Sequence, residues 1–278
     1  MNRFKTKNVV ITGAGSGLGR GLALNFAKMG WRVAVSDINM QRAEESLNLV
    51  RRAGGSGITV GCDVTKSEAV ECLADEVIAR MGSVDILINN AGVPVAGLME
   101  KISIDDWKYE IDIMLMSAVY GCKSFIPILK KQGWGQIVNV ASAAGIFSLP
   151  EMAPYNVTKA AVISLSETLR AELRGNNIGV TVVCPTFFKT RLLEQARFAD
   201  ERQMKMASAF FEKFSFGTIE SVSRATMKAI RKNRLYCIPQ PDAKLFRFLK
   251  RMTPQLYHDS TGILHARGYL DKILSIET

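Results

Sequence analysis

Residues 12–19 read Thr12-Gly13-Ala14-Gly15-Ser16-Gly17-Leu18-Gly19 and directly follow the apolar run Asn8-Val9-Val10-Ile11. Behind this glycine-rich turn, an amphipathic stretch from about Arg20 to Met29 indicates a helix that stops at Gly30. A strand, a glycine-rich turn and a helix in this order bring backbone N–H groups to a pyrophosphate at the positive end of the helix dipole. A tight bend with positive φ would also need glycines, but the position between strand and helix favours dinucleotide binding.

Outward from this turn, short β-branched runs alternate with amphipathic helical stretches along the chain. Further runs lie at residues 32–36, 58–61, 84–88, 136–140, 179–183 and, more weakly, 235–238. They are apolar almost throughout, which is typical of parallel strands that crossover helices bury on both faces. The sequence therefore predicts an α/β fold, a Rossmann-like doubly wound parallel sheet of about seven strands with helices on both faces, in a single domain spanning residues 1–239.

The composition is that of a globular protein with a large core. The chain has 278 residues, of which 47% are hydrophobic and 22% charged, and its net charge is +10. Nearly all of this excess lies between Arg202 and Arg251, where 12 Lys and Arg stand against 3 Asp and Glu. The nearly neutral first 200 residues argue against a nucleic-acid partner.

Cysteine spacing and hydropathy limit the class of protein further. The five cysteines lie ten or more residues apart, so no CxxC pair suggests a metal or redox site, and we expect no metal and reduced thiols. No apolar stretch approaches the roughly 20 residues of a membrane span, and the first residues lack the apolar segment of a signal peptide. We expect a cytoplasmic protein.

Four motifs share the order and spacing of a known family. They are the TGxxxGxG loop at 12–19, Asn89-Asn90-Ala91-Gly92 after the fourth strand, Ser142 after the fifth, and the YxxxK motif Tyr155-Asn156-Val157-Thr158-Lys159, which begins 13 residues after Ser142. From about residue 6 to residue 238 the chain therefore resembles the short-chain dehydrogenase/reductase family, whose members are NAD(P)-dependent oxidoreductases. The resemblance implies hydride transfer between a nicotinamide cofactor and an alcohol or carbonyl substrate.

The resemblance assigns catalytic roles to three residues. Tyr155 would be the general acid/base, and Ser142 would hydrogen-bond the substrate oxygen on which charge develops. A tyrosine has a pKa near ~10 and needs a neighbouring cation to act as a base at neutral pH. Lys159 lies one helical turn further on the same face, where its ammonium would favour the phenolate and reach the nicotinamide ribose.

The second strand ends at Asp37, 18 residues after Gly19. A carboxylate there accepts hydrogen bonds from the adenosine ribose and repels a 2′-phosphate, so we expect NAD in preference to NADP. Ser16 and Ile38 support this expectation, because NADP-preferring relatives often carry basic residues at these places. The full set of expected cofactor contacts is Gly13, Ser16, Gly17, Leu18, Gly19, Asp37, Asp63, Val64, Asn90, Ala91, Gly92, Tyr155, Lys159, Pro185 and Thr190.

One position departs from the family pattern. Counted from Trp107, Met114 occupies the place where relatives carry an Asn that links the active-site Lys through water to solvent. A thioether is only a weak acceptor and cannot replace that amide. Either water reaches Lys159 by another path, or turnover is slow, or the position has been substituted.

Residues 187–216 form the expected substrate lid and are rich in Phe, Met and Leu. Such side chains line apolar pockets, so a lipophilic secondary alcohol or ketone is the expected substrate, although the same residues would also pack the lid onto the core. The tail, residues 240–278, contains the basic amphipathic stretch 244–252, which can lie on an anionic membrane surface, close the active site or pack on another subunit. The helices around 104–131 and 154–174 match those through which family members form dimers and tetramers, so a homodimer or homotetramer is expected.

Two other functions remain open at this stage. An NADPH-dependent carbonyl or 3-oxoacyl reductase would share the same motifs. A dinucleotide-binding sensor or scaffold with little turnover would fit Met114, whereas intact Ser142, Tyr155 and Lys159 argue for an enzyme.

Overall fold

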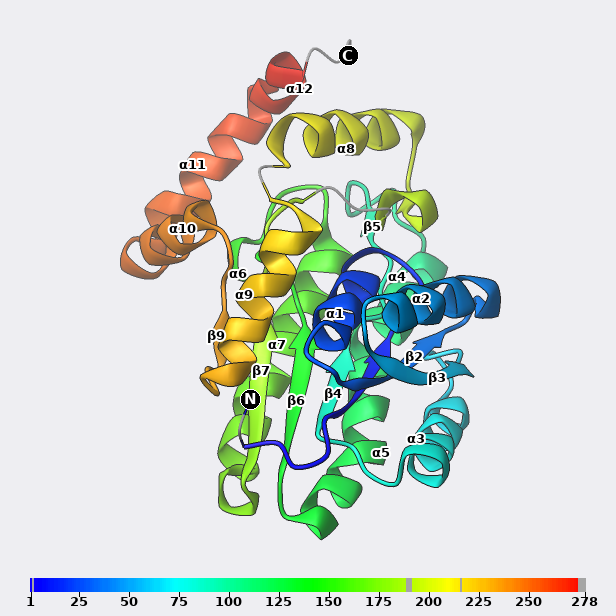
Figure 1. Cartoon of the computed structure of the whole chain (residues 1–278). Coiled ribbons are helices and arrows are strands. Elements are labelled where there is room, and N and C mark those ends of the chain that lie inside the picture. The colour runs from blue at the N-terminus through cyan, green and yellow to red at the C-terminus, as the bar shows by residue number, and fades with distance from the viewer. Residues whose placement is uncertain (2, 189–191, 216, 275–278) are drawn as a thin grey trace.

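A seven-stranded parallel sheet forms the centre of the computed structural model, which describes residues 1, 3–188, 192–215 and 217–274. The strand order is β3-β2-β1-β4-β6-β7-β9 (Figure 1). The strands are β1 (Asn8–Thr12), β2 (Arg32–Asp37), β3 (Ser56–Gly61), β4 (Ile86–Asn89), β6 (Gly135–Val140), β7 (Ile178–Val183) and β9 (Tyr236–Cys237). The predicted doubly wound α/β sheet is confirmed.

Two layers of helices cover the sheet (Figure 1). One face carries α1 (Gly17–Ala27), α2 (Met40–Arg52) and α9 (Ile219–Arg231), and the other carries α3 (Ser67–Met81), α5 (Ser117–Gln132) and α7 (Ala153–Glu172). Phe26 and Trp31 are fully buried in the first layer, and Phe125 in the second. Every residue of β1, β4 and β7 is buried, as expected for strands without hydrophobic alternation.

The helical stretch from Ile104 to Gln132 is continuous and consists of α4 (Ile104–Ile111), the π-helical turn η1 (Asp112–Met116) and α5. By length and composition alone it is apolar enough to cross a membrane, so the expectation that no such stretch exists was wrong. In the fold, α5 packs against α3 and the sheet and buries Cys122, Phe125 and Leu129. The inner face of α5 therefore belongs to the core, although only 33% of the apolar window is buried, and a core helix passes the same test as a membrane span.

The expected lid contains η3 (Leu192–Gln195), β8 (Arg197–Phe198), which pairs with β5 (Val95–Ala96), and α8 (Glu201–Phe214). The tail follows as α10 (Pro241–Met252), α11 (Pro254–Ala266) and α12 (Tyr269–Leu274), and the short elements α6 (Ala144–Phe147) and η2 (Arg174–Asn176) complete the chain.

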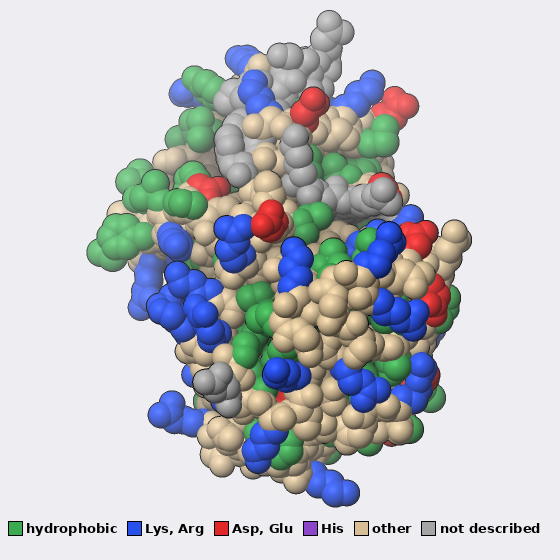
Figure 2. All heavy atoms as spheres, viewed as in Figure 1, with side chains coloured by type: hydrophobic (Ala, Val, Ile, Leu, Met, Phe, Trp, Pro, Cys, Tyr) green, Lys and Arg blue, Asp and Glu red, His purple; other side chains and the backbone are tan. Residues whose placement is uncertain are grey.

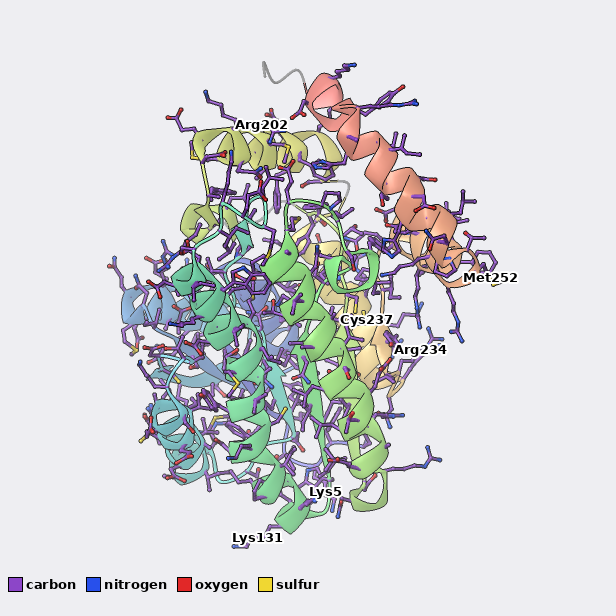
Figure 3. The ribbon with its side chains drawn as sticks, turned by 180° about the vertical axis from the view of Figure 1, so that it is seen from behind. Lys5, Lys131, Arg202, Arg234, Cys237 and Met252 are labelled. Atoms are coloured by element: carbon purple, nitrogen blue, oxygen red, sulfur yellow. The ribbon has the colours of Figure 1, made fainter. Side chains whose placement is uncertain are left out.

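The tail is tied to the lid through one arginine. On α8, Arg202 pairs with Asp271 of α12 at 2.7 Å and with Glu151, in the loop before α7, at 3.3 Å (Figure 3 labels Arg202). The tail therefore contacts the lid helix α8, while the three roles expected for it stay predictions.

Candidate active site

The glycine-rich loop lies where the carboxyl end of β1 meets the N-terminus of α1. Gly13 and Gly17 have φ angles of 62° and 53°, a region that favours glycine. A Cβ on Gly19 would lie 2.3 Å from the carbonyl oxygen of Gly13, so only glycine lets helix and loop approach this closely. The first turn of α1 carries no acidic residue. A backbone turn of this shape at a helix N-terminus fits a pyrophosphate.

Asn90 connects this loop to the neighbouring strand. Its side-chain amide donates hydrogen bonds to the carbonyls of Thr12, at 2.9 Å, and Gly13, at 3.2 Å. The backbone N–H groups of Asn90 and Ala91 donate to the Thr12 hydroxyl. The ends of β1 and β4 are thereby held together, at the edge of the sheet where strand order reverses and ligands of such folds bind.

A cleft with a cavity volume of about 200 Å³ runs along this edge. The predicted residues that line it are Gly13, Ser16, Gly17, Leu18, Asp37, Asp63, Val64, Asn90, Ala91, Gly92, Tyr155, Lys159 and Pro185. Gly19 and Ser142 stand behind this lining, and Thr190 lies outside the described residues.

At the far end of the cleft, Asp37 is oriented by two backbone groups. Its carboxylate accepts a hydrogen bond from the N–H of Gly15 at 2.8 Å and another from the N–H of Asn39 at 2.9 Å. Asp63 lines the cleft, and its carboxylate also accepts hydrogen bonds from the backbone N–H and the hydroxyl of Thr65. Asp63 can therefore stabilise the local turn and border the cleft at the same time.

Several lining residues were not among the predicted contacts. They are Ile38, Arg42, Cys62, Val93, Ile113, Met114, Val140, Ala141 and Phe188. Most are apolar neighbours of strand ends, and counting one or two residues beyond each motif would have found them. Arg42, in the first turn of α2, carries the nearest basic side chain to Asp37 in this lining.

The three predicted catalytic residues meet at the near end of the cleft. The Ser142 side chain lies near the Tyr155 hydroxyl. The Ser142 hydroxyl itself donates to the carbonyl of Pro185 at 3.4 Å and accepts from the backbone N–H of Ala144 at 3.1 Å. The Lys159 ammonium donates to the carbonyl of Val140 at 3.0 Å and lies 5.8 Å from the centre of the Tyr155 ring. All three side chains are buried, and they form one polar cluster between the ends of β6 and the first turns of α7.

A buried chain of hydrogen bonds holds α7 in place. The Asn89 amide donates to Asn139 at 2.8 Å, and the Asn139 amide donates to the hydroxyl of Ser166 at 2.9 Å. Because Ser166 lies two turns after Lys159 on the same helix, these bonds set the position of α7 relative to β4 and β6.

Comparison with known proteins agrees with this geometry. Residues 7–201 match the family model for short chain dehydrogenase. The chain belongs to the short-chain dehydrogenase family. The oxidoreductase SadH of Mycobacterium tuberculosis is 32% identical over 260 residues, which cover 92% of this chain and 94% of SadH.

Two further relatives bear on cofactor and substrate. A 3beta-hydroxysteroid dehydrogenase of Mediterraneibacter gnavus is 34% identical over 197 residues, covering 70% of this chain and 71% of that protein. A short-chain dehydrogenase/reductase from Burkholderia phymatum, solved in complex with NAD, is 32% identical with a TM-score of 0.85 and covers 92% of this chain and 96% of its own. This chain is thus similar throughout its length to a dehydrogenase that binds NAD.

In this short-chain dehydrogenase the pKa of Tyr155 is shifted in the direction opposite to the one expected. Burial raises the pKa of Tyr155 to about 12, the hydrogen bond with Ser142 opposes the rise, and the carboxyl of Glu110 adds to it. Burial also lowers the pKa of Lys159, so the ammonium that was expected to lower the pKa of Tyr155 is itself destabilised. At neutral pH Tyr155 is therefore a protonated phenol, ready to donate.

Met114 lies inside the catalytic cluster. It is buried with Ala144 and Tyr155, lines the cleft and approaches Gly92, on which a Cβ would stand 2.5 Å from its sulfur. The departure from the family pattern is therefore located at the active site itself. Within the described part of the chain, no group of three or more His, Cys, Asp or Glu side chains could hold a metal ion.

Replacing Gly19 with Ala should weaken NADH binding about tenfold or more, since the new methyl group would force Gly13 and Asn90 apart. Fluorescence titration with NADH measures the dissociation constant. Gly175→Ala is the matched control, because a Cβ there meets nothing within 4 Å. Equal affinities of the two variants for NADH would contradict the prediction that this loop binds the pyrophosphate of the cofactor.

Proposed function

We propose that this short-chain dehydrogenase is an NAD-dependent enzyme that interconverts a lipophilic secondary alcohol and its ketone. The observation that carries the proposal is the buried group of Ser142, Tyr155 and Lys159 at one end of a cleft whose other end holds the oriented carboxylate of Asp37. A turnover screen of secondary alcohols with NAD tests it directly.

The chain's own residues supply proton transfer and orientation. Bound NAD(H) would exchange the hydride with the substrate carbon. During ketone reduction, Tyr155 donates its phenolic proton to the substrate oxygen, and during alcohol oxidation it takes that proton back. The Ser142 hydroxyl donates a hydrogen bond to the same oxygen and stabilises the charge that develops on it. Lys159, with its lowered pKa, is suited to exchange protons with this site near neutral pH.

An apolar wall supports the choice of a lipophilic substrate. Val93 and Phe188 line the cleft, and the ring of Phe187 packs on Phe210 and Phe211 of α8 at centroid distances of 4.7 and 5.5 Å. These lid aromatics therefore serve packing as well as the enclosure of the cleft. The similarity to a hydroxysteroid dehydrogenase points to the same class of substrate.

The proposed assembly and location are supported by the family resemblance and the sequence. We propose a cytoplasmic homodimer or homotetramer formed through the outer faces of α4, α5 and α7, where Ile104 and Val157 are exposed apolar residues. The alternatives are an NADPH-dependent carbonyl or 3-oxoacyl reductase, which a preference for NADPH would reveal, and a sensor with little turnover, which would bind NADH without oxidising any alcohol.

Tyr155→Phe should reduce turnover by about 10²-fold or more and leave NADH binding nearly unchanged, because only the acid/base hydroxyl is removed. Steady-state rates and a fluorescence titration measure the two quantities. If the variant kept more than about a tenth of the wild-type rate, Tyr155 would not be the general acid/base.

NAD should be preferred over NADP by about tenfold or more, and Asp37→Ala should narrow this ratio because the carboxylate no longer repels a 2′-phosphate. The control is Asp63→Asn, which changes another carboxylate of the cleft and should affect NADH and NADPH alike. Equal affinities of the unmodified enzyme for NADH and NADPH would instead show that a basic residue such as Arg42 accommodates the phosphate.

A further inference from the structure

Glu110 on α4 is a carboxyl group whose side chain is completely buried against α7. Among the described residues, neither of its oxygens has a hydrogen-bond partner. The backbone N–H of Val95 and the hydroxyl of Thr158 favour its ionised form, but neither reaches the geometry of a normal hydrogen bond. A buried carboxylate is costly unless it is paired or protonated, so its presence here needs a physical reason.

Lys159 lies on α7, the helix against which α4 packs, and its ammonium attracts the Glu110 carboxyl without forming a direct ion pair among the described residues. Burial raises the pKa of Glu110 and lowers that of Lys159, while attraction between the two groups opposes both changes. The Glu110 carboxyl also acts electrostatically on Tyr155 of α7, and one turn earlier on α4 Asp106 pairs with surface Arg197 of β8 at 2.9 Å. Because burial brings the two pKa values toward each other, a proton can pass between carboxyl and amine at a small free-energy cost.

Met114 follows one turn after Glu110, across the π-helical turn η1, a feature that often marks functional sites. A Cβ on Gly92 would lie 2.5 Å from the Met114 sulfur and 3.8 Å from the Lys159 nitrogen, so both side chains border the same backbone position. Met114 offers no N–H or amide oxygen there. Within α4 and η1, the buried residues are Glu110 and Met114, so Glu110 is the buried polar group of this segment.

We propose that Glu110 is a positioning residue that stores and exchanges the proton of Lys159, in place of the polar group that Met114 lacks. The proposal rests on the proposed function. In ketone reduction, Tyr155 loses its proton to the substrate oxygen and regains one from the Lys159 ammonium. The neutral amine then takes the proton of the Glu110 carboxylic acid through a bridging water, and solvent water returns a proton to the carboxylate. In alcohol oxidation each proton moves the opposite way.

Glu110→Gln should lower kcat about tenfold or more, with KM for substrate and NADH nearly unchanged, because the amide keeps the shape of the side chain but cannot exchange its proton. The loss of the negative charge should also lower the pKa of Lys159 further. The alkaline fall of kcat for ketone reduction should therefore move to lower pH, and the solvent isotope effect on kcat should rise. Glu110→Asp should keep part of the activity and the pH profile closer to that of the wild type.

The double variant Glu110→Gln with Met114→Asn supplies a rescue test. An Asn at 114 restores a group that can hold water beside Lys159, so kcat should return to within about threefold of the wild type. The single variant Met114→Asn supplies the reference rate against which the rescue is measured. Asp112→Asn, which removes an exposed carboxylate from the same helical stretch, is the matched control and should leave kcat and its pH profile unchanged.

Thermal unfolding and NADH titration establish that each variant is folded. A folded Glu110→Gln enzyme with the kcat, pH profile and isotope effect of the wild type would overturn the proposal, and so would a loss of activity that Met114→Asn does not rescue.

A measurement independent of turnover separates this proposal from the proposed function. The infrared band of a buried protonated carboxyl should titrate with pH in the wild type and vanish in Glu110→Gln, whether or not a substrate has been found, and its absence from the wild type would also overturn the proposal.

A different observation concerns α10, which carries apolar residues on two faces. Its inner face buries Ala243, stacks Phe246 against Phe147 at 5.6 Å and bonds the Lys250 ammonium to the carbonyl of Ile146 at 2.6 Å. Its outer face exposes Leu245, Phe248, Leu249 and Met252. Residues at this spacing form one continuous stripe along a helix. Met252 lies at the C-terminal end of this stripe, as Figure 3 shows.

Basic side chains flank the apolar stripe on the outer face of α10. Lys244 and Arg251 are exposed beside it, and Arg247 lies over the ring of Tyr236 at 4.2 Å. Figure 2 shows hydrophobic side chains gathered over α10, next to a group of Lys and Arg side chains. A second copy docked symmetrically on this stripe would bring like charges together, whereas an anionic lipid surface complements both the charge and the apolar stripe.

We propose that the outer face of α10 docks on an anionic membrane surface. The full-length protein should cosediment with vesicles of phosphatidylcholine mixed with phosphatidylglycerol, and binding should weaken in high salt and on phosphatidylcholine alone. Phe248→Ser with Met252→Ser should abolish binding, and Lys244→Glu with Arg251→Glu should weaken it about fivefold or more for each charge.

Ile263→Ser with Leu264→Ser is the matched control, because these residues are similarly exposed on α11, which carries no Lys or Arg. It should bind vesicles like the wild type. Two results of the vesicle assay would overturn the proposal: no binding by the wild type, or equal binding by the two double-serine variants. Self-association of the protein in light scattering that Phe248→Ser abolishes would also overturn it, because the stripe would then dock on a second copy of the chain.

Discussion

The parallel pairing of β1 with β4 is the constraint on which the rest of the site depends. It aligns Ile11 with Ile88, so the glycine-rich loop and Asn90 leave the sheet side by side. The Asn90 amide can then donate hydrogen bonds to the carbonyls of Thr12 and Gly13, at the turn into α1. A slip of one residue would turn the buried side chains of both strands over and separate the loop from the amide that supports it.

The same edge of the sheet buries several ionisable groups together, and burial decides their electrostatics. Tyr155, Lys159 and Glu110 each lose hydration, so the neutral form of each becomes more favourable. Tyr155 therefore keeps its proton. Lys159 and Glu110 bind a proton with similar affinity. Attraction between Lys159 and Glu110 limits these effects, which is why removing one partner would leave the other an unpaired buried charge.

Local signals in the sequence predicted the sheet and indicated that the glycine-rich loop, Ser142, Tyr155 and Lys159 lie at one edge of it, because each signal depends on a short pattern whose position in the fold is unambiguous. Their roles in cofactor binding and catalysis, which the family resemblance implied, stay predictions. Glu110 was missed, since a single carboxyl in an amphipathic helix is ordinarily a surface group and only the packing of α4 on α7 buries it. The pattern of α10 indicated an amphipathic helix, but periodicity cannot tell which face meets the protein when both faces carry apolar side chains. The continuous stretch 104–132 was misjudged because the buried side of a core helix and a membrane span share one composition.

The tail and the active site are mechanically connected through Glu151. This residue has a positive φ of 61°, lies in the loop between Ser142 and Tyr155, and accepts bonds from Arg202 and Gln203 of α8. Arg202 in turn holds Asp271 of α12, so the lid is fastened both to the loop that precedes the catalytic helix and to the end of the tail. Glu151 also lies 3.6 Å from His265 of α11, so both the lid helix and the tail place a basic side chain on this carboxylate. Because a buried carboxylate is costly without such partners, displacement of α8 would leave His265 as the basic neighbour of Glu151 among the described residues. The loop before the catalytic helix is therefore stabilised from both the lid and the tail.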